Sequence, residues 1–456
     1  MQPINTREYL EKLEAAIEEQ NVAFIRESME DVHPADISQV LDELNTPQSK
    51  YVIDLLPPEV SAEILSNLDE ETTRRFLRVF ESAEIAALVP YMDSDDAADL
   101  LDHQPVRFRE EVIALIDDRE TAEHIIELLH YDEDCAGGLM AKELIKAYDT
   151  WNVVQTIEEI RRQAENVEKI HTIYVVDSQE RLLGKVSIKR ILLAKANTRI
   201  ADIFDRDLIS VESYRDKEEV SDLMQKYDLE AIPVVNIQNR LLGRITIDDI
   251  VDVITEKAEE DIAAMSGISA GAEEDDGVFR SVRARLPWLL IGMAGGLIGA
   301  QLMGLFEGDL KEITALALFT PLITATGGNV GIQNSTVVVQ SLGRDVFSGN
   351  KRTEKIIRAL GIAVVNAITI SLIVFVFFLL YGRPFGLALV VSIALFSVVI
   401  LASITGTVTP LVLDRYGVNP ALASGPFITT ANDLLGLTVY FSVAHWLRPL
   451  LASGPF

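Results

Sequence analysis

Residues 280–456 of this 456-residue chain contain five long apolar stretches, and residues 1–279 contain no stretch of that length. Each stretch is long enough to cross a hydrocarbon core of about 30 Å. They run over residues 286–306, 313–341, 356–381, 385–413 and 420–450. The pattern predicts an all-α membrane domain of five helices over residues 280–456, behind a large soluble part.

Charge divides the chain at the same place. Residues 1–279 hold 63 Asp and Glu against 28 Lys and Arg, a net charge near −35, whereas residues 280–456 hold 7 against 12. Lys and Arg bias a loop toward the cytoplasm. They gather before the first span and between the second and third: Arg280, Arg283, Arg285, Arg344, Lys351, Arg352, Lys355 and Arg358. We therefore expect a multi-pass protein of the cytoplasmic (inner) membrane, with residues 1–279 in the cytoplasm and the C-terminus outside.

The N-terminus and the cysteine content agree with that location. Residues 1–10 are polar and lack the apolar core of a signal peptide, so the first span is expected to direct insertion. Cys135 is the only cysteine, so no disulfide forms within the chain, which suits a reducing compartment.

Short amphipathic helices with a recurring start signal fill residues 1–135. The signal recurs at roughly regular spacings, in Pro34-Ala35-Asp36-Ile37, Pro58-Glu59-Val60, Ala83-Glu84-Ile85 and Asp95-Asp96-Ala97-Ala98. Helices repeated in this way stack as hairpins that bury their apolar faces against neighbours. We expect an all-α superhelical N domain, with an ordinary helical bundle as the alternative.

Residues 136–200 and 201–255 contain two copies of one pattern, in which Ile173 corresponds to Ile232. Two segments of the first copy, Ile173–Asp177 and Arg181–Ile188, match Ile232–Asn236 and Arg240–Ile247 of the second. β-Branched runs around a polar turn and a glycine predict strand, turn, strand and helix in each copy. The repeat resembles an α/β tandem cystathionine-β-synthase (CBS) pair, a module that often binds adenine nucleotides or senses ions. ATP is therefore a candidate ligand.

The two copies differ in charge where the final helix begins. The first copy has Lys189 and Arg190 where the second has Asp248 and Asp249, and further acids follow toward the membrane. Clustered oxygen ligands are what Mg²⁺ and Ca²⁺ require, and multivalent ions would relieve the self-repulsion of so acidic a domain. We expect residues 249–279 to form an acidic connecting helix and joint. A solvated helix surface and a passive linker are the alternatives.

Asp433 is the only acid well within a span. Because a charge at bilayer depth costs at least about 2.5 kcal/mol, such a residue favours a cation site over a structural role. The second span supplies a polar run, Thr324–Ser335, whose amides and hydroxyls would be costly against lipid. Interrupted polar stretches in two spans are typical of a translocation site.

The whole chain resembles the MgtE-type magnesium channels and transporters, in their order of N domain, CBS pair, connecting helix and five spans. The most specific matches are Gly327-Gly328-Asn329-Val330-Gly331 with Gln333, Gly343-Arg344-Asp345, and Ser424 to Asp433. The resemblance implies a homodimer with Asp433 present twice around one central pore. It also implies that hydrated Mg²⁺ is the substrate, and that high cytoplasmic Mg²⁺ closes the pore through the connecting helices.

Carried over by resemblance, Asp433 is the pore metal site, and the candidates to line the pore are Asn329, Gln333, Thr430 and Asn432. The implied regulatory Mg²⁺ ligands are Asp95, Asp99, Asp216, Glu218, Asp228, Asp249, Asp252, Glu260 and Asp261. Lys257 stands where some members carry an acid, and Gly425 where some carry Asn.

Two rival functions are weighed against this one. The first is a carrier for Co²⁺, Zn²⁺ or Mn²⁺. The softer of these ions are disfavoured as substrates, because one Cys and six His offer few of the thiol and imidazole ligands that such metals prefer. A transporter gated mainly by nucleotide at the CBS pair is the other. An enzyme is not expected, because no nucleophile–base pair or phosphate-binding glycine loop stands out. The expected partners are the lipid bilayer and a second copy of the chain, with no nucleic acid.

Overall fold

The computed structural model describes residues 7–68, 70–102, 104–163, 172–269, 277–312, 314–344 and 352–451. The chain forms two compact units, Met1–Ile254 and Thr255–Phe456, joined within helix α14 (Ile247–Ser266). A helical N-terminal part, a pair of CBS-like sheets and five long apolar helices confirm the predicted fold class. Asp345, most of the joint before the first span and the repeated C-terminal residues 452–456 lie outside the described residues.

Short helices build the N-terminal part of the first unit. They are α1 (Arg7–Glu18), α2 (Val22–Met29), α3 (Pro34–Asp42), α4 (Thr46–Ile53), α5 (Pro58–Ser66), α6 (Glu70–Phe76), η1 (Leu77–Val79), α7 (Ser82–Leu88), η2 (Val89–Tyr91), α8 (Ser94–Asp102), α9 (Val106–Leu115) and α10 (Arg119–Leu128). The predicted start signals are confirmed, because α3 and α5 begin at their prolines, where a missing N–H costs no hydrogen bond. One apolar core, which includes Leu41, Ile64 and Phe76, runs through these helices.

Two three-stranded sheets follow, one in each CBS copy. The first copy contains β1 (Ile145–Tyr148), α11 (Val153–Gln163), β2 (Ile173–Val176), β3 (Leu182–Val186), α12 (Ile188–Leu193) and η4 (Ile200–Asp202). The second contains β4 (Val211–Glu212), α13 (Lys217–Tyr227), β5 (Ala231–Val235) and β6 (Leu241–Thr246) and continues into α14. In each sheet the first strand pairs parallel with the second and the second pairs antiparallel with the third. The predicted strand repeat is confirmed.

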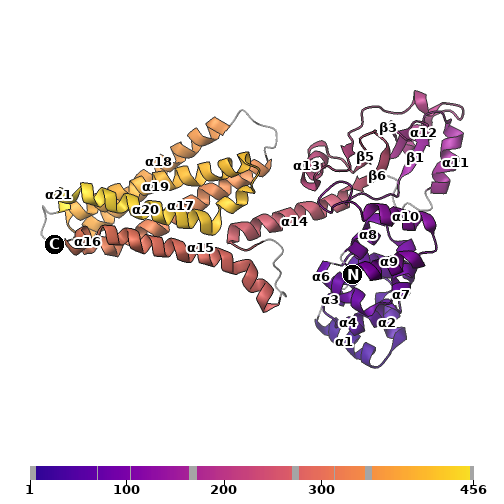
Figure 1. Ribbon diagram of the computed structural model, residues 1–456, viewed down its shortest axis with the longest axis horizontal. Helices are drawn as coiled ribbons and strands as arrows, with labels where there is room; N and C mark the ends of the chain where they lie inside the picture. The colour runs from indigo at the N-terminus through magenta and orange to yellow at the C-terminus, as the bar shows by residue number, and fades with distance from the viewer. Residues whose placement is uncertain are drawn as a thin grey trace. The chain divides into compact units, whose positions relative to one another are not determined.

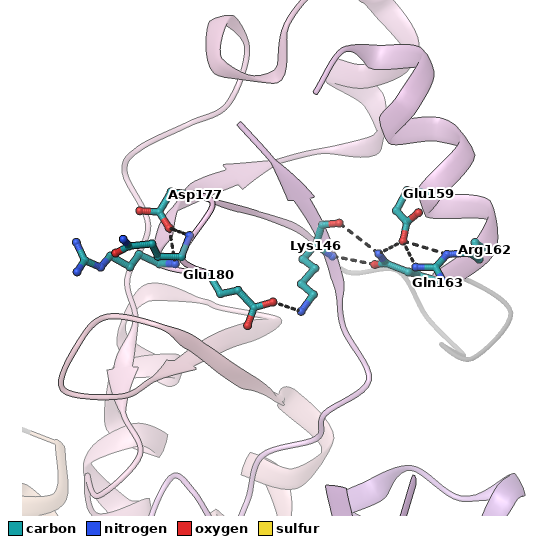
Figure 2. A network of polar contacts seen from close by, with 8 residues as sticks. Lys146, Glu159, Arg162, Gln163, Asp177 and Glu180 are labelled. Atoms are coloured by element: carbon teal, nitrogen blue, oxygen red, sulfur yellow. Dashed lines mark hydrogen bonds and ion pairs between the residues drawn. The ribbon is translucent and has the colours of Figure 1, made fainter. Parts of the chain in front are cut away.

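Several charged groups of the first copy are paired within that copy, as Figure 2 shows around Lys146. The Lys146 ammonium on β1 lies 2.8 Å from Glu180 Oε1, and the Lys146 backbone N–H donates to Gln163 of α11. Gln163 in turn donates to Glu159, and Asp177 accepts two backbone N–H groups of the β2–β3 turn. These carboxylates therefore serve the local fold.

The second unit holds the five helices that are long and apolar enough to cross a membrane, which confirms the predicted spans. Its elements are α15 (Val278–Leu305), α16 (Glu307–Glu312), α17 (Ala315–Arg344), α18 (Arg352–Leu380), α19 (Phe385–Arg415), η5 (Pro420–Ala423), α20 (Gly425–Trp446) and α21 (Arg448–Leu451). α19 packs against α17, α18 and α20, and α15 packs against α20 (Figure 1). In its most apolar window 61% of the α19 residues are buried, against 11% in α15, so α19 forms the centre of the bundle.

Candidate functional site

Three carboxylates gather in the first unit between the N-terminal helices and the CBS pair. Oxygens of Asp93, Asp95 and Glu143 all lie within 4.8 Å of one another, and Asp95 is only 8% exposed. Asp93 and Asp95 flank the first residue of α8, and Glu143 precedes β1. A divalent cation that takes oxygen ligands fits such a group. Of the three, only Asp95 was among the predicted ligands.

Ser94 holds this acidic cluster together. Its backbone N–H and its hydroxyl both donate to Glu143 Oε2, at 3.1 and 2.8 Å, and its Oγ accepts from the backbone N–H of Lys142. The positive end of the helix dipole at the start of α8 favours acids there. The position of Glu143 therefore depends on the contact between the two parts of the unit.

Burial makes the cluster costly to ionise. It raises the pKa of Asp95 well above the ordinary value of 3.8, and the neighbouring charge of Asp249 raises it further. Burial likewise raises the pKa of Asp96 to about 7 and that of Asp249 to about 6. A bound divalent cation would favour the ionised carboxylates, because opposite charge offsets the loss of hydration.

The raised pKa values predict an unusual pH dependence of stability when no metal is bound. The folded state holds these protons more tightly than the unfolded state, so their stabilising contribution is complete below about pH 4 and is lost as the pH rises through 6 to 7. In EDTA, the calorimetric unfolding temperature of the first unit in the full-length chain should fall across that range. Added Mg²⁺ should raise it most at pH 8, whereas a shift that is equal at pH 5 and pH 8 would contradict metal binding by these acids.

The other predicted regulatory residues of the first unit lie at several places. Asp249, in the first turn of α14, accepts hydrogen bonds from the backbone N–H and hydroxyl of Thr246. Its charge also raises the pKa of Asp95. Asp99 lies one turn after Asp95 on α8. Asp216 and Asp228 cap opposite ends of α13, an eleven-residue helix about 16 Å long. The exposed residues Glu218 and Asp252 lie near the starts of α13 and α14.

Asp216 and Asp228 are thus too far apart to bind one ion together. Asp216 accepts from the backbone N–H of Glu218, and Asp228 adopts a left-handed conformation with φ of 50°. The charge of Asp249 acts on Asp95, whereas Asp216 and Asp228 lie at opposite ends of α13.

In the second unit, the last turns of α14 pack against the start of α20. Asp261 Oδ1 accepts from Asn419 Nδ2 at 3.0 Å, and Ala264 is buried with Val339 and Ala421. Glu260 is exposed and Lys257 is half-buried on the same helix. The acidic connecting helix therefore contacts the membrane helices through one of its predicted ligands.

Two glycines permit this contact. Gly425 has φ of +60°, and a Cβ there would lie 2.1 Å from the carbonyl oxygen of Met265. Gly267 has φ of +74°, and its Cβ would lie 2.4 Å from Pro426 Cγ. Both positions combine a left-handed backbone with a close approach that a larger residue would prevent. The departure from Asn at Gly425 thus has a local structural reason.

Asp433 is half-buried on α20, against the glycine run of α17. A Cβ at Gly328 would lie 3.3 Å from Thr429 Cγ2 and 3.8 Å from Asp433 Oδ1. α17 is one continuous helix, so the glycines allow close packing of α20 and do not break the span. A break was expected in two spans; among the described residues the fifth span is interrupted before α20, where Ser424 is extended and Gly425 left-handed, whereas the second span is not.

The four predicted pore-lining residues do not share one surface of the chain. Asn329 and Gln333 are exposed, one turn apart on the same face of α17. Thr430 is half-buried beside Gly295 of α15. Asn432 is only 2% exposed within the bundle. Its burial had no sequence signal, because it depends on helices α17 and α19.

Comparison with known proteins covers nearly the whole chain. A family described as a divalent cation transporter matches residues 320–443, the MgtE intracellular N domain matches residues 32–134, and CBS domains match residues 136–197 and 200–256. A magnesium transporter MgtE of Thermus thermophilus is 32% identical over 447 residues, which cover 95% of this chain and 97% of that protein. One of Bacillus subtilis is 27% identical over 419 residues, with coverage of 92% and 93%.

A solved structure resembles the soluble part. The cytosolic domain of the Mg²⁺ channel MgtE, crystallised in complex with ATP, is 33% identical and has a TM-score of 0.50. The match covers 54% of this chain and 99% of that domain.

Proposed function

The chain belongs to the MgtE family of magnesium transporters, and from this premise we propose that it is a homodimeric, Mg²⁺-selective channel of the cytoplasmic membrane. In the proposal, the N-terminal unit lies in the cytoplasm, the C-terminus lies outside, and Mg²⁺ bound to the acidic unit closes the pore. The observation that carries the proposal is Asp433, held half-buried on α20 against the glycine face of α17.

Two copies of Asp433 would hold a hydrated ion in the pore of the dimer. Mg²⁺ gives up its waters reluctantly, so carboxylates around a wide polar path would bind it through them. The exposed amides of Asn329 and Gln333 support this arrangement, because such groups are costly against lipid and favour a face that meets water or a partner. Selectivity would then come from pore width and water geometry.

Closure would begin at the acidic cluster of Asp93, Asp95 and Glu143 together with Asp249. An ion there would favour the arrangement in which these acids are close, and its loss would leave like charges to repel one another. Such an ion acts as a gate only if it binds the compact state more tightly than the open one. The contact of Asp261 with Asn419, just before η5, and the close approach of Met265 to Gly425 support a route from α14 to α20.

Flux measurements with several ions test the transport function. Proteoliposomes with the purified chain should take up Mg²⁺ in preference to Co²⁺ and Zn²⁺, because the proposed pore groups offer carboxylate, amide and hydroxyl oxygens and no thiol or imidazole. Faster uptake of Co²⁺ or Zn²⁺ would favour a carrier for those ions instead.

ATP at the CBS pair is a second regulatory candidate, since the related cytosolic domain was crystallised with ATP. A ligand that binds only the folded state raises the unfolding temperature. Thermal unfolding with ATP, with Mg²⁺ and with both separates the two regulators. A shift with ATP alone, accompanied by flux control that ignores Mg²⁺, would favour a nucleotide gate.

Gly425→Ala should produce a channel that cytoplasmic Mg²⁺ closes poorly. The added methyl group would collide with the Met265 carbonyl and would force the end of α14 away from α20. Flux at saturating cytoplasmic Mg²⁺ should then rise severalfold above that of wild type. Gly382→Ala is a matched control, because Gly382 also has a positive φ (68°) but no atom lies within 4 Å of its added methyl group. Equal leakage in both variants would contradict the α14 contact as the gate.

A further inference from the structure

A buried amide joins three membrane helices directly beside Asp433. Asn432 of α20 is 2% exposed, and Thr405 of α19 donates from Oγ1 to Asn432 Oδ1 at 2.6 Å. Asn432 Nδ2 has no hydrogen-bond partner among the described residues. A buried amide N–H group without a hydrogen-bond partner lowers the stability of the fold, so its presence needs a structural or functional reason.

The link between Asn432 and Thr405 holds for either orientation of the amide. The Thr405 hydroxyl also lies 3.1 and 3.0 Å from the carbonyls of Leu401 and Ala402 on its own helix. It is able to donate to Asn432 Oδ1, or to donate to its own helix and accept from the amide nitrogen. Both arrangements tie α20 to α19.

Glycines on the two neighbouring helices provide the space that this side chain occupies. A Cβ at Gly331 of α17 would lie 1.8 Å from Asn432 Nδ2. A Cβ at Gly406 of α19 would lie 2.5 Å from the Gly331 carbonyl oxygen. The backbones of α17 and α19 therefore approach closely beside Asn432, and a larger residue at Gly331 would collide with its amide.

We propose that Asn432 and Thr405 form a latch that fixes the rotation of α20 and so positions the carboxylate of Asp433. The latch rests on the proposed role of Asp433 in the pore, and it makes Asn432 a positioning residue that does not contact the ion. Adjacent residues of a helix point about 100° apart, so a fixed Asn432 sets the direction of Asp433.

The size of the effect follows from helix geometry. The tip of a side chain lies roughly 5 to 6 Å from the helix axis. If α20 rotated by about 20°, that tip would therefore move by about 2 Å. A hydrated Mg²⁺ keeps its waters in a near-ideal octahedron, so carboxylates that bind it through those waters must match a fixed shell, whereas the shell of Ca²⁺ is irregular and adapts. A displaced carboxylate should therefore weaken Mg²⁺ binding and reduce the preference for Mg²⁺ over Ca²⁺.

The experiment compares Thr405→Val with Thr405→Ser in proteoliposomes, with Asp433→Ala alongside. Thr405→Val keeps the side-chain volume but removes the hydroxyl. Thr405→Ser keeps the hydroxyl. Thr405→Val should raise the half-saturating Mg²⁺ concentration about fivefold, in line with one hydrogen bond, and lower the Mg²⁺ to Ca²⁺ flux ratio. Thr405→Ser should restore both values.

The matched control is Thr438→Val, because the Thr438 hydroxyl donates only to the Leu434 carbonyl of its own helix in the described contacts. Unchanged half-saturation and ion preference in Thr405→Val would overturn the latch, as would an equal change in Thr405→Ser or Thr438→Val. Flux that survives Asp433→Ala would instead overturn the proposed pore site, so the two failures are distinguishable.

Discussion

Replacing Asp433 with alanine should abolish Mg²⁺ flux while the protein still inserts into the membrane. In the proposed pore this carboxylate carries the charge that offsets the positive ion, and its removal leaves no acid well within a span. Insertion should not suffer, because a neutral residue is cheaper at bilayer depth than a charged one. The measurement is Mg²⁺ uptake per reconstituted protein at equal yield.

Two further variants test whether the loss of flux is due to the loss of charge at this position. Asp433→Asn keeps the size of the side chain but removes its charge, so it should fail as completely as the alanine variant. Glu307→Ala removes an acid between the first two spans and should keep wild-type uptake. Retained uptake in Asp433→Ala would remove this residue from the ion path.

The double variant Asp95→Asn with Asp249→Asn should leave the channel open at a cytoplasmic Mg²⁺ concentration that closes wild type. Both asparagines can keep the hydrogen bonds that these side chains accept from Asp96 N–H and from Thr246. Only the charge that attracts the regulatory ion is lost, so the cytoplasmic unit should stay folded. The measurement is the fraction of flux that remains as cytoplasmic Mg²⁺ rises.

A matched loss of charge elsewhere serves as the control. Glu18→Gln with Glu19→Gln removes two exposed acids near the end of α1, far in sequence from the acidic cluster. This control should close as wild type does. Normal closure of the Asp95 and Asp249 variant would show that the regulatory ion binds elsewhere.

The elements of the fold were largely predictable because each has a strong local cause. The five spans follow from hydropathy, since a chain within lipid must satisfy its backbone in helices. Pro34 and Pro58 mark the starts of α3 and α5 because proline fits the first turn of a helix. The strands of the CBS pair follow from β-branched runs that recur at a fixed offset.

The composition of the sites was less predictable because it depends on contacts distant in sequence. Glu143 joins Asp93 and Asp95 through Ser94, which lies far from it in the chain, and no motif at Glu143 indicates this. Asn432 lies in the same polar run as Asp433, so sequence alone suggested the same environment for both. The structure buries Asn432 against Gly331, because a helix directs adjacent residues to different faces.

The connecting helix shows a third limit. The sequence predicted an acidic segment that could bind ions, but the packing of its end against α20 depends on Gly425 and Gly267, whose positive φ values no composition pattern revealed. Asp261 accordingly has a protein partner, Asn419, in addition to its predicted role as a metal ligand.

In the proposed function, Mg²⁺ bound to the acidic first unit closes a pore that carries Mg²⁺. The most direct test of this closure is Mg²⁺ flux through the reconstituted wild-type protein while free Mg²⁺ is raised only on the face that bears the N-terminal unit. Flux along the path that Asp433 lines should fall toward zero as the concentration passes through the millimolar range, about where weak carboxylate sites fill. Flux that stays constant across that range, after correction for the changed gradient, would contradict the proposed closure.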